Sequence, residues 1–165
     1  MTQPRYAGFW RRLLATIIDS LLLMPLLALL LQLVYGTDYW RWAELHGGMF
    51  DLYGPADLLI NYLLPLALTV FFWVRFRGSP GKLLLGCRVV DARSGGTLGV
   101  GQAVLRWFAY IVSALPLCLG FLWIAWDARK QGFHDKIAGS VVVRCSAGAE
   151  TDSLPPTLDD VRRNL

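Results

Sequence analysis

Two charged residues lie inside an otherwise apolar stretch near the start of the chain. Arg12 and Asp19 are seven residues apart in the segment from Trp10 to Tyr35. On a helix this spacing is about two turns, so both side chains lie on nearly one face with Cα atoms about 10–11 Å apart. A carboxylate within a membrane helix costs about 2.5–3.5 kcal/mol and usually faces a partner or a water-filled cavity. The spacing predicts a polar Arg12–Asp19 pair that another helix or water completes.

A second group of charged residues lies between Trp126 and Gly139, where His134 stands beside Asp135 and Asp127 lies upstream. An imidazole titrates near neutral pH, so His134 is a candidate proton carrier. In the alternative interpretation, Asp135 caps a short helix and His134 is solvated. Asp19 also has two interpretations: an ion-binding or proton-binding group, or a buried polar group that fixes how the helices pack.

The sequence carries no established catalytic or metal-binding motif. H-E-x-x-H and G-x-S-x-G are absent, and the two histidines do not have the spacing of metal ligands. Residues 79–82 lack the spacing of a phosphate-binding loop and indicate a turn with an interfacial lysine. The three cysteines are isolated and are interpreted as packing or surface thiols: Cys87, Cys118 and Cys145. We therefore expect no enzymatic activity, no catalytic residue, no metal and no cofactor.

The composition indicates a membrane protein. Of the 165 residues 55% are hydrophobic and only 17% are charged, whereas about a quarter are charged in ordinary soluble domains. The apolar residues form stretches of about twenty, the length that crosses a roughly 30 Å hydrocarbon core. The net charge of +4 comes from residues that flank these stretches, which argues against nucleic-acid binding. The first stretch is too long for a signal-peptide core and is expected to stay as an anchor.

Three hydrophobic helices are expected, at about 10–35, 58–74 and 103–126. Between the first two, residues 36–57 hold four acidic side chains against one arginine, and Asp57 fits the N-cap of the second helix. Residues 75–106 hold six basic side chains against one aspartate. By the positive-inside rule, the first loop is external, the second is cytoplasmic and the N-terminus is cytoplasmic.

The third stretch contains Pro116 and Gly120, so it is either one crossing or a hairpin of two half-length helices. One crossing would place four basic residues outside and separate the strand expected at 87–91 from a matching β-branched run at 140–143. The hairpin, which keeps both runs on one side, is favoured; its non-helical backbone is tolerated if protein buries it. A Gly-Gly turn and a return strand are also expected after residue 91. Residues 1–145 are expected to form the membrane domain, and 146–165 a disordered cytoplasmic tail.

Several motifs occur together in one order along residues 6–145. They are Trp10-Arg11-Arg12-Leu13-Leu14-Ala15 followed by Asp19, Ser79-Pro80-Gly81-Lys82-Leu83-Leu84-Leu85-Gly86 leading into Arg88-Val89-Val90-Asp91, then Arg106, Phe133-His134-Asp135 and Ala138-Gly139-Ser140. This pattern resembles the RDD family of bacterial integral membrane proteins, named for one arginine and two aspartates. The resemblance implies that Arg12 is the family arginine and Asp19 the first aspartate. It implies Asp135 as the second, with Asp127 as the rival; Ser140 stands where relatives more often carry threonine.

The expected fold class is an all-α membrane protein, a small multi-pass helical bundle with a short cytoplasmic β element, in the bacterial inner membrane. Cation–proton exchange has been suggested for some family members. The first functional hypothesis is therefore a small transporter in which Asp19 binds a proton or monovalent cation and Asp135 or His134 relays protons. The alternative is a non-catalytic scaffold or accessory subunit that docks a partner. The expected partners are the lipid bilayer, a monovalent cation or proton, and a second copy or another membrane protein.

Overall fold

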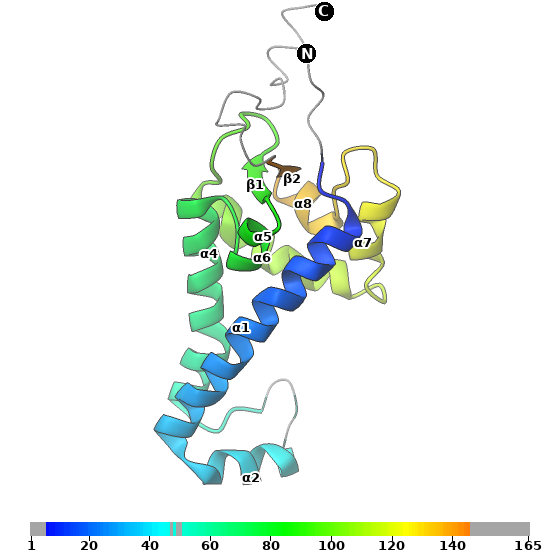
Figure 1. Ribbon diagram of the computed structural model, residues 1–165. Helices are drawn as coiled ribbons and strands as arrows, with labels where there is room; N and C mark the ends of the chain where they lie inside the picture. The colour runs from blue at the N-terminus through cyan, green and yellow to red at the C-terminus, as the bar shows by residue number, and fades with distance from the viewer. Residues whose placement is uncertain (1–5, 47, 49–50, 146–165) are drawn as a thin grey trace, which may run out of the picture.

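The computed structural model describes residues 6–46, 48 and 51–145, so the tail predicted at 146–165 lies outside the described residues. The chain is mostly helical with one small sheet (Figure 1). In chain order the elements are α1 (Phe9–Tyr35), α2 (Thr37–His46), α3 (Pro55–Leu58), the π-helix η1 (Leu59–Leu63), α4 (Leu64–Phe76), α5 (Pro80–Leu84), β1 (Cys87–Asp91), α6 (Val100–Ala114), α7 (Leu119–Leu122), the 3₁₀-helix η2 (Trp123–Ala125), α8 (Phe133–Ile137) and β2 (Ser140–Arg144).

Among the described residues, two helical segments are long and apolar enough to cross a membrane, Phe9–Tyr35 and Pro55–Leu84. Most large apolar side chains of α1 are exposed, including Leu21, Met24 and Leu33. An apolar surface of this extent is unfavourable in water and is matched to lipid. The first two predicted helices, at 10–35 and 58–74, are therefore present, and the second begins earlier and includes a π-helical turn.

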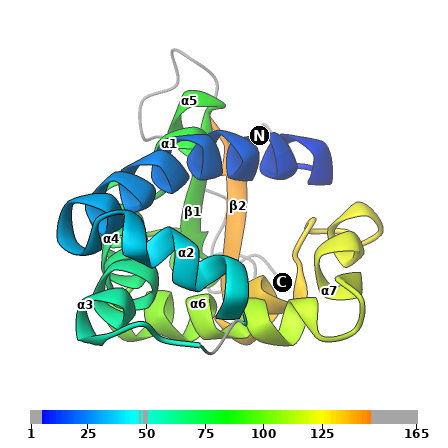
Figure 2. The same cartoon turned by 90° about the horizontal axis from the view of Figure 1, so that it is seen from below.

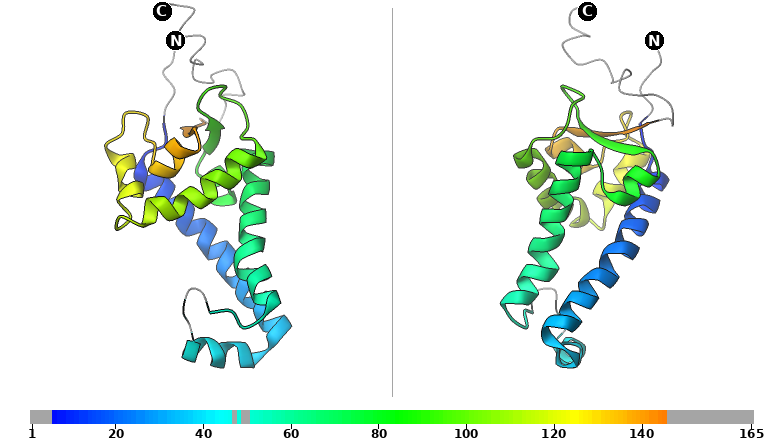
Figure 3. Two further views of the ribbon diagram at one scale, coloured as in Figure 1. Left: turned by 180° about the vertical axis from the view of Figure 1, so that it is seen from behind. Right: turned by 60° about the vertical axis from the view of Figure 1, so that its left-hand side comes forward.

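The third apolar stretch does not form one straight helix. The chain bends by 111° between α6 and the helical segment Leu119–Ala125, and α6 runs from α4 across the sheet end of the molecule (Figures 1 and 3). After this bend the chain returns to the sheet, where β1 pairs antiparallel with β2. Because paired strands must lie on one side of the membrane, the structure favours the hairpin over a single crossing.

The two-stranded sheet forms the core at one end of the molecule, opposite α2 (Figure 1). Val89 pairs with Val142, and the chain before α1 extends the sheet because Ala7 N donates to Val142 O at 2.9 Å. One side of this sheet packs on the buried Trp73 of α4 and Ala103 of α6. The predicted return strand after residue 91 is not formed, because the Asp91 carboxylate accepts the backbone N–H groups of residues 93 and 94 and holds a turn there.

Asp57 does not cap the second membrane helix as expected. The helix begins at Pro55, and the Asp57 side chain is buried, where it accepts hydrogen bonds from Tyr39 Oη, Asn61 Nδ2 and the Tyr53 backbone N–H. These bonds join α2, the preceding loop and η1 at the α2 end of the molecule, which faces the viewer in Figure 2. The carboxylate therefore fixes the connection between the two membrane-spanning segments.

Candidate functional site

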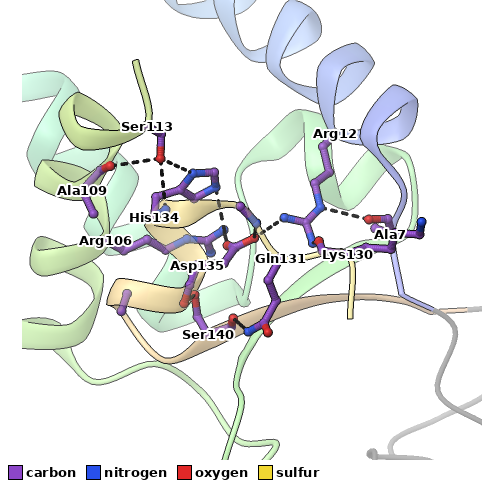
Figure 4. A network of polar contacts seen from close by, with 12 residues as sticks. Ala7, Arg12, Arg106, Ala109, Ser113, Lys130, Gln131, His134, Asp135 and Ser140 are labelled. Carbon is purple, nitrogen blue, oxygen red and sulfur yellow. Dashed lines mark hydrogen bonds and ion pairs between the residues drawn. The ribbon is translucent and has the colours of Figure 1, made fainter. Parts of the chain in front are cut away.

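Asp135 lies at the centre of a buried ion cluster (Figure 4). Each of its two carboxylate oxygens forms an ion pair with a different arginine: Oδ2 with Arg12 of α1 and Oδ1 with Arg106 of α6. Asp135 is 0% exposed and Arg106 is 1% exposed. Hydrogen bonds between ionised partners are the strongest kind in proteins. The cluster therefore ties the start of the first membrane helix to the middle of α6 through one residue of α8.

Arg12 is also held by backbone carbonyl groups. Its Nε donates to Ala7 O at 3.0 Å and its Nη2 to Lys130 O at 2.6 Å. Ala7 precedes α1 and extends the sheet, and Lys130 lies in the loop before α8 (Figure 4). Each of the three guanidinium nitrogens of Arg12 therefore donates a hydrogen bond. The planar guanidinium group, with its fixed set of donors, is suited to such multiple bonding.

Asp135 also caps its own helix. α8 begins after Gly132, and the Gly132 backbone N–H donates to Asp135 Oδ2 at 3.1 Å, as in a capping box. The helix cap expected for Asp135 is therefore present, together with the two ion pairs. Burial alone would raise the pKa of the Asp135 carboxyl, but the guanidinium groups of Arg106 and Arg12 outweigh it and hold that pKa below its ordinary value. Asp135 is an anion at neutral pH.

His134 is buried, contrary to the interpretation that it is solvated. Its Nδ1 lies 3.1 Å from Ser113 Oγ of α6, and the same hydroxyl accepts the His134 backbone N–H at 3.0 Å. Burial lowers the pKa of the imidazole to about 3, with Arg106 and Arg12 opposing its protonation and Asp135 favouring it. The ring is therefore neutral at pH 7, which does not fit the proton carrier expected near neutral pH.

Arg12 and Asp19 do not form the predicted pair. Asp19 instead faces the start of α5: Ser79 Oγ donates to its Oδ2, and the Gly81 backbone N–H donates to its Oδ1 at 2.7 Å. A side chain at Gly81 would come well inside 3.0 Å of the Ala15 carbonyl oxygen on α1, so only glycine allows this approach. Other segments complete the polar site of α1, as expected, but they differ for the two residues. Arg12 pairs with Asp135 of α8, and Asp19 accepts hydrogen bonds at the start of α5.

A cavity of about 790 Å³ lies between α1, α4, α6 and α7. Polar side chains line one part of it: Arg12, Thr16, Asp19, Ser79, Lys82, Arg106 and His134. Leucines of α1 and α4 and the aromatic rings of Phe72 and Phe121 line the remainder. Lys82, expected at an interfacial turn, is buried, with Nζ 5.6 Å from the centre of the Trp73 ring. A space of this size is typical of small-ligand sites.

Asp127 lies outside the buried ion cluster. Its Oδ1 pairs with Lys136 Nζ at 2.6 Å, and its Oδ2 accepts the backbone N–H groups of Arg129 and Gln131. Burial acts to raise the pKa of this carboxyl, but the bonds to Lys136 and the backbone lower it overall. Asp127 shapes the loop before α8, and it is Asp135 that meets the family arginine.

Arg106, Ser79 and Lys82 were not selected as site residues from the sequence. A signal for Arg106 existed, because it is a charged side chain within the apolar stretch at 103–126, where such residues are costly. Ser79 and Gly81 belong to the motif at 79–86 that carries the family resemblance, but their bonds to Asp19 depend on how α5 packs against α1. Within the described ranges 6–46 and 51–145, no three His, Cys, Asp or Glu side chains gather as metal ligands.

Comparison with known proteins gives the chain a family. Residues 6–139 match the RDD family. An uncharacterized protein YxaI of Bacillus subtilis is 29% identical over 83% of this chain and 96% of its own length. The uncharacterized membrane protein YteJ of the same species is 29% identical over 84% of this chain and 80% of its own length. The proline-rich antigen of Mycobacterium leprae is 36% identical over 38% of this chain and 25% of its own length. No solved structure matches.

Proposed function

We propose that this chain, which belongs to the RDD family of membrane proteins by its match over residues 6–139, is a small carrier that exchanges a monovalent cation for a proton at Asp19. The observation that supports the proposal most is the placement of Asp19. Among the described aspartates and glutamates, it is the one that lines the cavity between the helices. A carboxylate at such a position is typical of ion and proton pathways in membrane proteins.

The other family aspartate is unsuited to exchange. Asp135 is fully buried between Arg12 and Arg106, so a proton or cation would have to displace a guanidinium to reach it. Removing one partner of such a pair is costly, about 3–5 kcal/mol. We assign Asp135 and Arg12 the role of fixing α1 against α6 and α8, and Asp19 the role of exchange.

The surroundings of Asp19 supply oxygen atoms, the ligands that hard cations prefer. Ser79 Oγ already contacts the carboxylate, and the hydroxyl of Thr16 lines the same cavity. In the proposed cycle, ionised Asp19 holds the cation, and protonation of the carboxylate removes its charge and releases the cation. No chemical bond of a substrate is made or broken, so the proposal includes no enzymatic activity. We place the protein in the bacterial inner membrane with its N-terminus in the cytoplasm, following the basic residues between 75 and 106.

The test is proton flux in proteoliposomes. Purified full-length protein is reconstituted with an internal pH dye, and Na⁺, K⁺ or Li⁺ is added outside. Wild type and Asp127→Asn, a matched loss of one carboxylate outside the cavity, are expected to produce a cation-dependent pH change that Asp19→Asn lacks. Equal traces for Asp19→Asn and wild type, or no response to any of the cations by folded wild type, would refute the proposal.

A second candidate is a scaffold or accessory subunit. It is favoured by the ion cluster, because Arg12, Asp135 and Arg106 join three segments of the chain. This function predicts that affinity purification in mild detergent recovers a stoichiometric partner and that Asp19→Asn weakens the partner's retention. A preparation that exchanges cations with no second protein present would exclude it as the main role.

A further inference from the structure

Two residues of the cavity wall carry buried N–H groups that have no acceptor among the described residues. Arg106 is 1% exposed, yet its Nε and Nη1 donate to no atom of the described residues, and the same holds for Nε1 of the buried Trp73. Both side chains line the cavity. Buried donors of this kind are rare in native proteins, and each one calls for an acceptor.

Lys82 adds a buried positive charge beside these donors. Lys82 takes part in none of the ion pairs of the described residues, and its Nζ donates a long hydrogen bond to Ser79 Oγ at 3.4 Å. Lys82 and Arg106 lie on the ring of the same residue, with their charged atoms 5.6 Å and 4.7 Å from the centre of Trp73. A buried charge without a partner is costly, so this position favours an anion.

The remaining charges on the cavity wall do not cancel this preference. Arg12 contributes a third cation, and the neutral His134 contributes none. Among the described residues Asp19 is the acidic group on the wall, and it offsets one of these three positive charges. Asp135, which pairs with Arg12 and Arg106 from behind, offsets a second, so one positive charge remains.

The apolar wall indicates what kind of anion fits. From the polar end the cavity continues along leucines of α1 and α4, among them Leu22, Leu26 and Leu68. Leu22 and Leu26 are also partly exposed, so their side chains can contact a lipid acyl chain. A free phosphate would leave this apolar part unused, whereas a lipid acyl chain fills it.

We propose that the cavity is a binding site for one anionic phospholipid, with the phosphate at Lys82, Arg106 and Trp73 Nε1 and one acyl chain along α1 and α4. The inference does not depend on cation exchange at Asp19, and its test measures bound lipid rather than flux. The lipid would act as the missing acceptor for the buried donors and would join α1, α4 and α6 into one unit.

The test is native mass spectrometry of the full-length protein released from nanodiscs of phosphatidylcholine with 20 mol% phosphatidylglycerol, a composition chosen here as roughly that of a mildly anionic bilayer. Wild type is expected to keep one phosphatidylglycerol in preference to phosphatidylcholine. Lys82→Gln is expected to reduce that preference about fivefold, the effect of about one lysine charge on an anionic lipid. Lys130→Gln, which removes the same charge from a half-buried side chain that lies outside the cavity lining and contacts Ala125 O, is expected to keep the preference.

Two further arms complete the test. Leu26→Trp narrows the apolar part of the cavity and changes no charge, so it is expected to reduce retention of the lipid. If Lys82→Gln fails to fold, this variant tests the proposal in its place. Inorganic phosphate at millimolar concentration should not displace the lipid. No preference in wild type, equal retention in all variants, or full displacement by phosphate would overturn the proposal, the last outcome indicating a free-phosphate site.

Discussion

Arg12 and Asp135 lie 123 residues apart in the sequence and form a buried ion pair. The pair brings the two ends of the domain together, because it joins the first turn of α1 to α8, the last helix before β2. Because Arg12 pairs with Asp135, it does not pair with Asp19, which lies two turns further along α1. Asp19 instead accepts hydrogen bonds from residues at the start of α5 and lines the cavity. The two family aspartates thus occupy two different environments, one sealed between arginines and one on a cavity wall.

The close approach of α5 to α1 depends on Gly81. Gly81→Ala would place a methyl group against the Ala15 carbonyl, and overpacking of this kind costs about 1–3 kcal/mol. We expect a lower free energy of unfolding in SDS titrations of the detergent-solubilised protein. Gly101→Ala is the matched control because nothing lies within 4 Å of its added carbon, and in a helix it should stabilise by about 0.5–1 kcal/mol. Equal effects would show that α5 does not pack there.

The buried His134 predicts how stability depends on pH. Its pKa of about 3 in the folded protein is below the ordinary value of about 6.5 that the unfolded chain has. Between these values the unfolded state binds the extra proton, so stability is complete above pH 6.5 and decreases as pH falls toward 3. Thermal unfolding from pH 7 to pH 4 should show this decrease in wild type and a smaller one in His134→Asn.

His46 supplies the control for this prediction, because it is exposed and lies far from the ion cluster, on α2. His46→Asn should follow wild type across the same pH range. If His134→Asn and wild type lose stability in parallel, the imidazole is not kept neutral by burial.

The hairpin predicts which residues share a side of the membrane. In a background without Cys87 and Cys118, we expect Cys145 and, separately, Arg88→Cys to react with an impermeant thiol reagent from the same side, since β1 and β2 are paired. Glu44→Cys on α2, at the opposite end of the molecule (Figure 1), should react from the other side. With a cytoplasmic N-terminus, the first two react in inverted vesicles only. Reaction of Cys145 and Arg88→Cys from opposite sides would contradict the paired strands.

The sequence predicted the elements better than their contacts. The helix expected at 10–35 is α1 and the strand expected at 87–91 is β1, because continuous apolar length and β-branched runs are local properties. Helical spacing describes only one helix, so it placed Arg12 and Asp19 on one face and left open which other segment completes the site. The true partner comes from a segment that reaches Arg12 only after α6 and α7 have turned back. The bonds from Ser79 and Gly81 to Asp19 likewise depend on tertiary packing.

A double-mutant cycle tests the partner of Arg12 most directly. Free energies of unfolding are measured for Arg12→Gln, Asp135→Asn and Asp19→Asn alone, and for Arg12→Gln combined with each aspartate change. Residues in direct contact have interaction energies of about 0.5–3 kcal/mol, and independent residues have values near zero. We predict a coupling in that range between Arg12 and Asp135 and none between Arg12 and Asp19. A coupling between Arg12 and Asp19 with none to Asp135 would contradict the account.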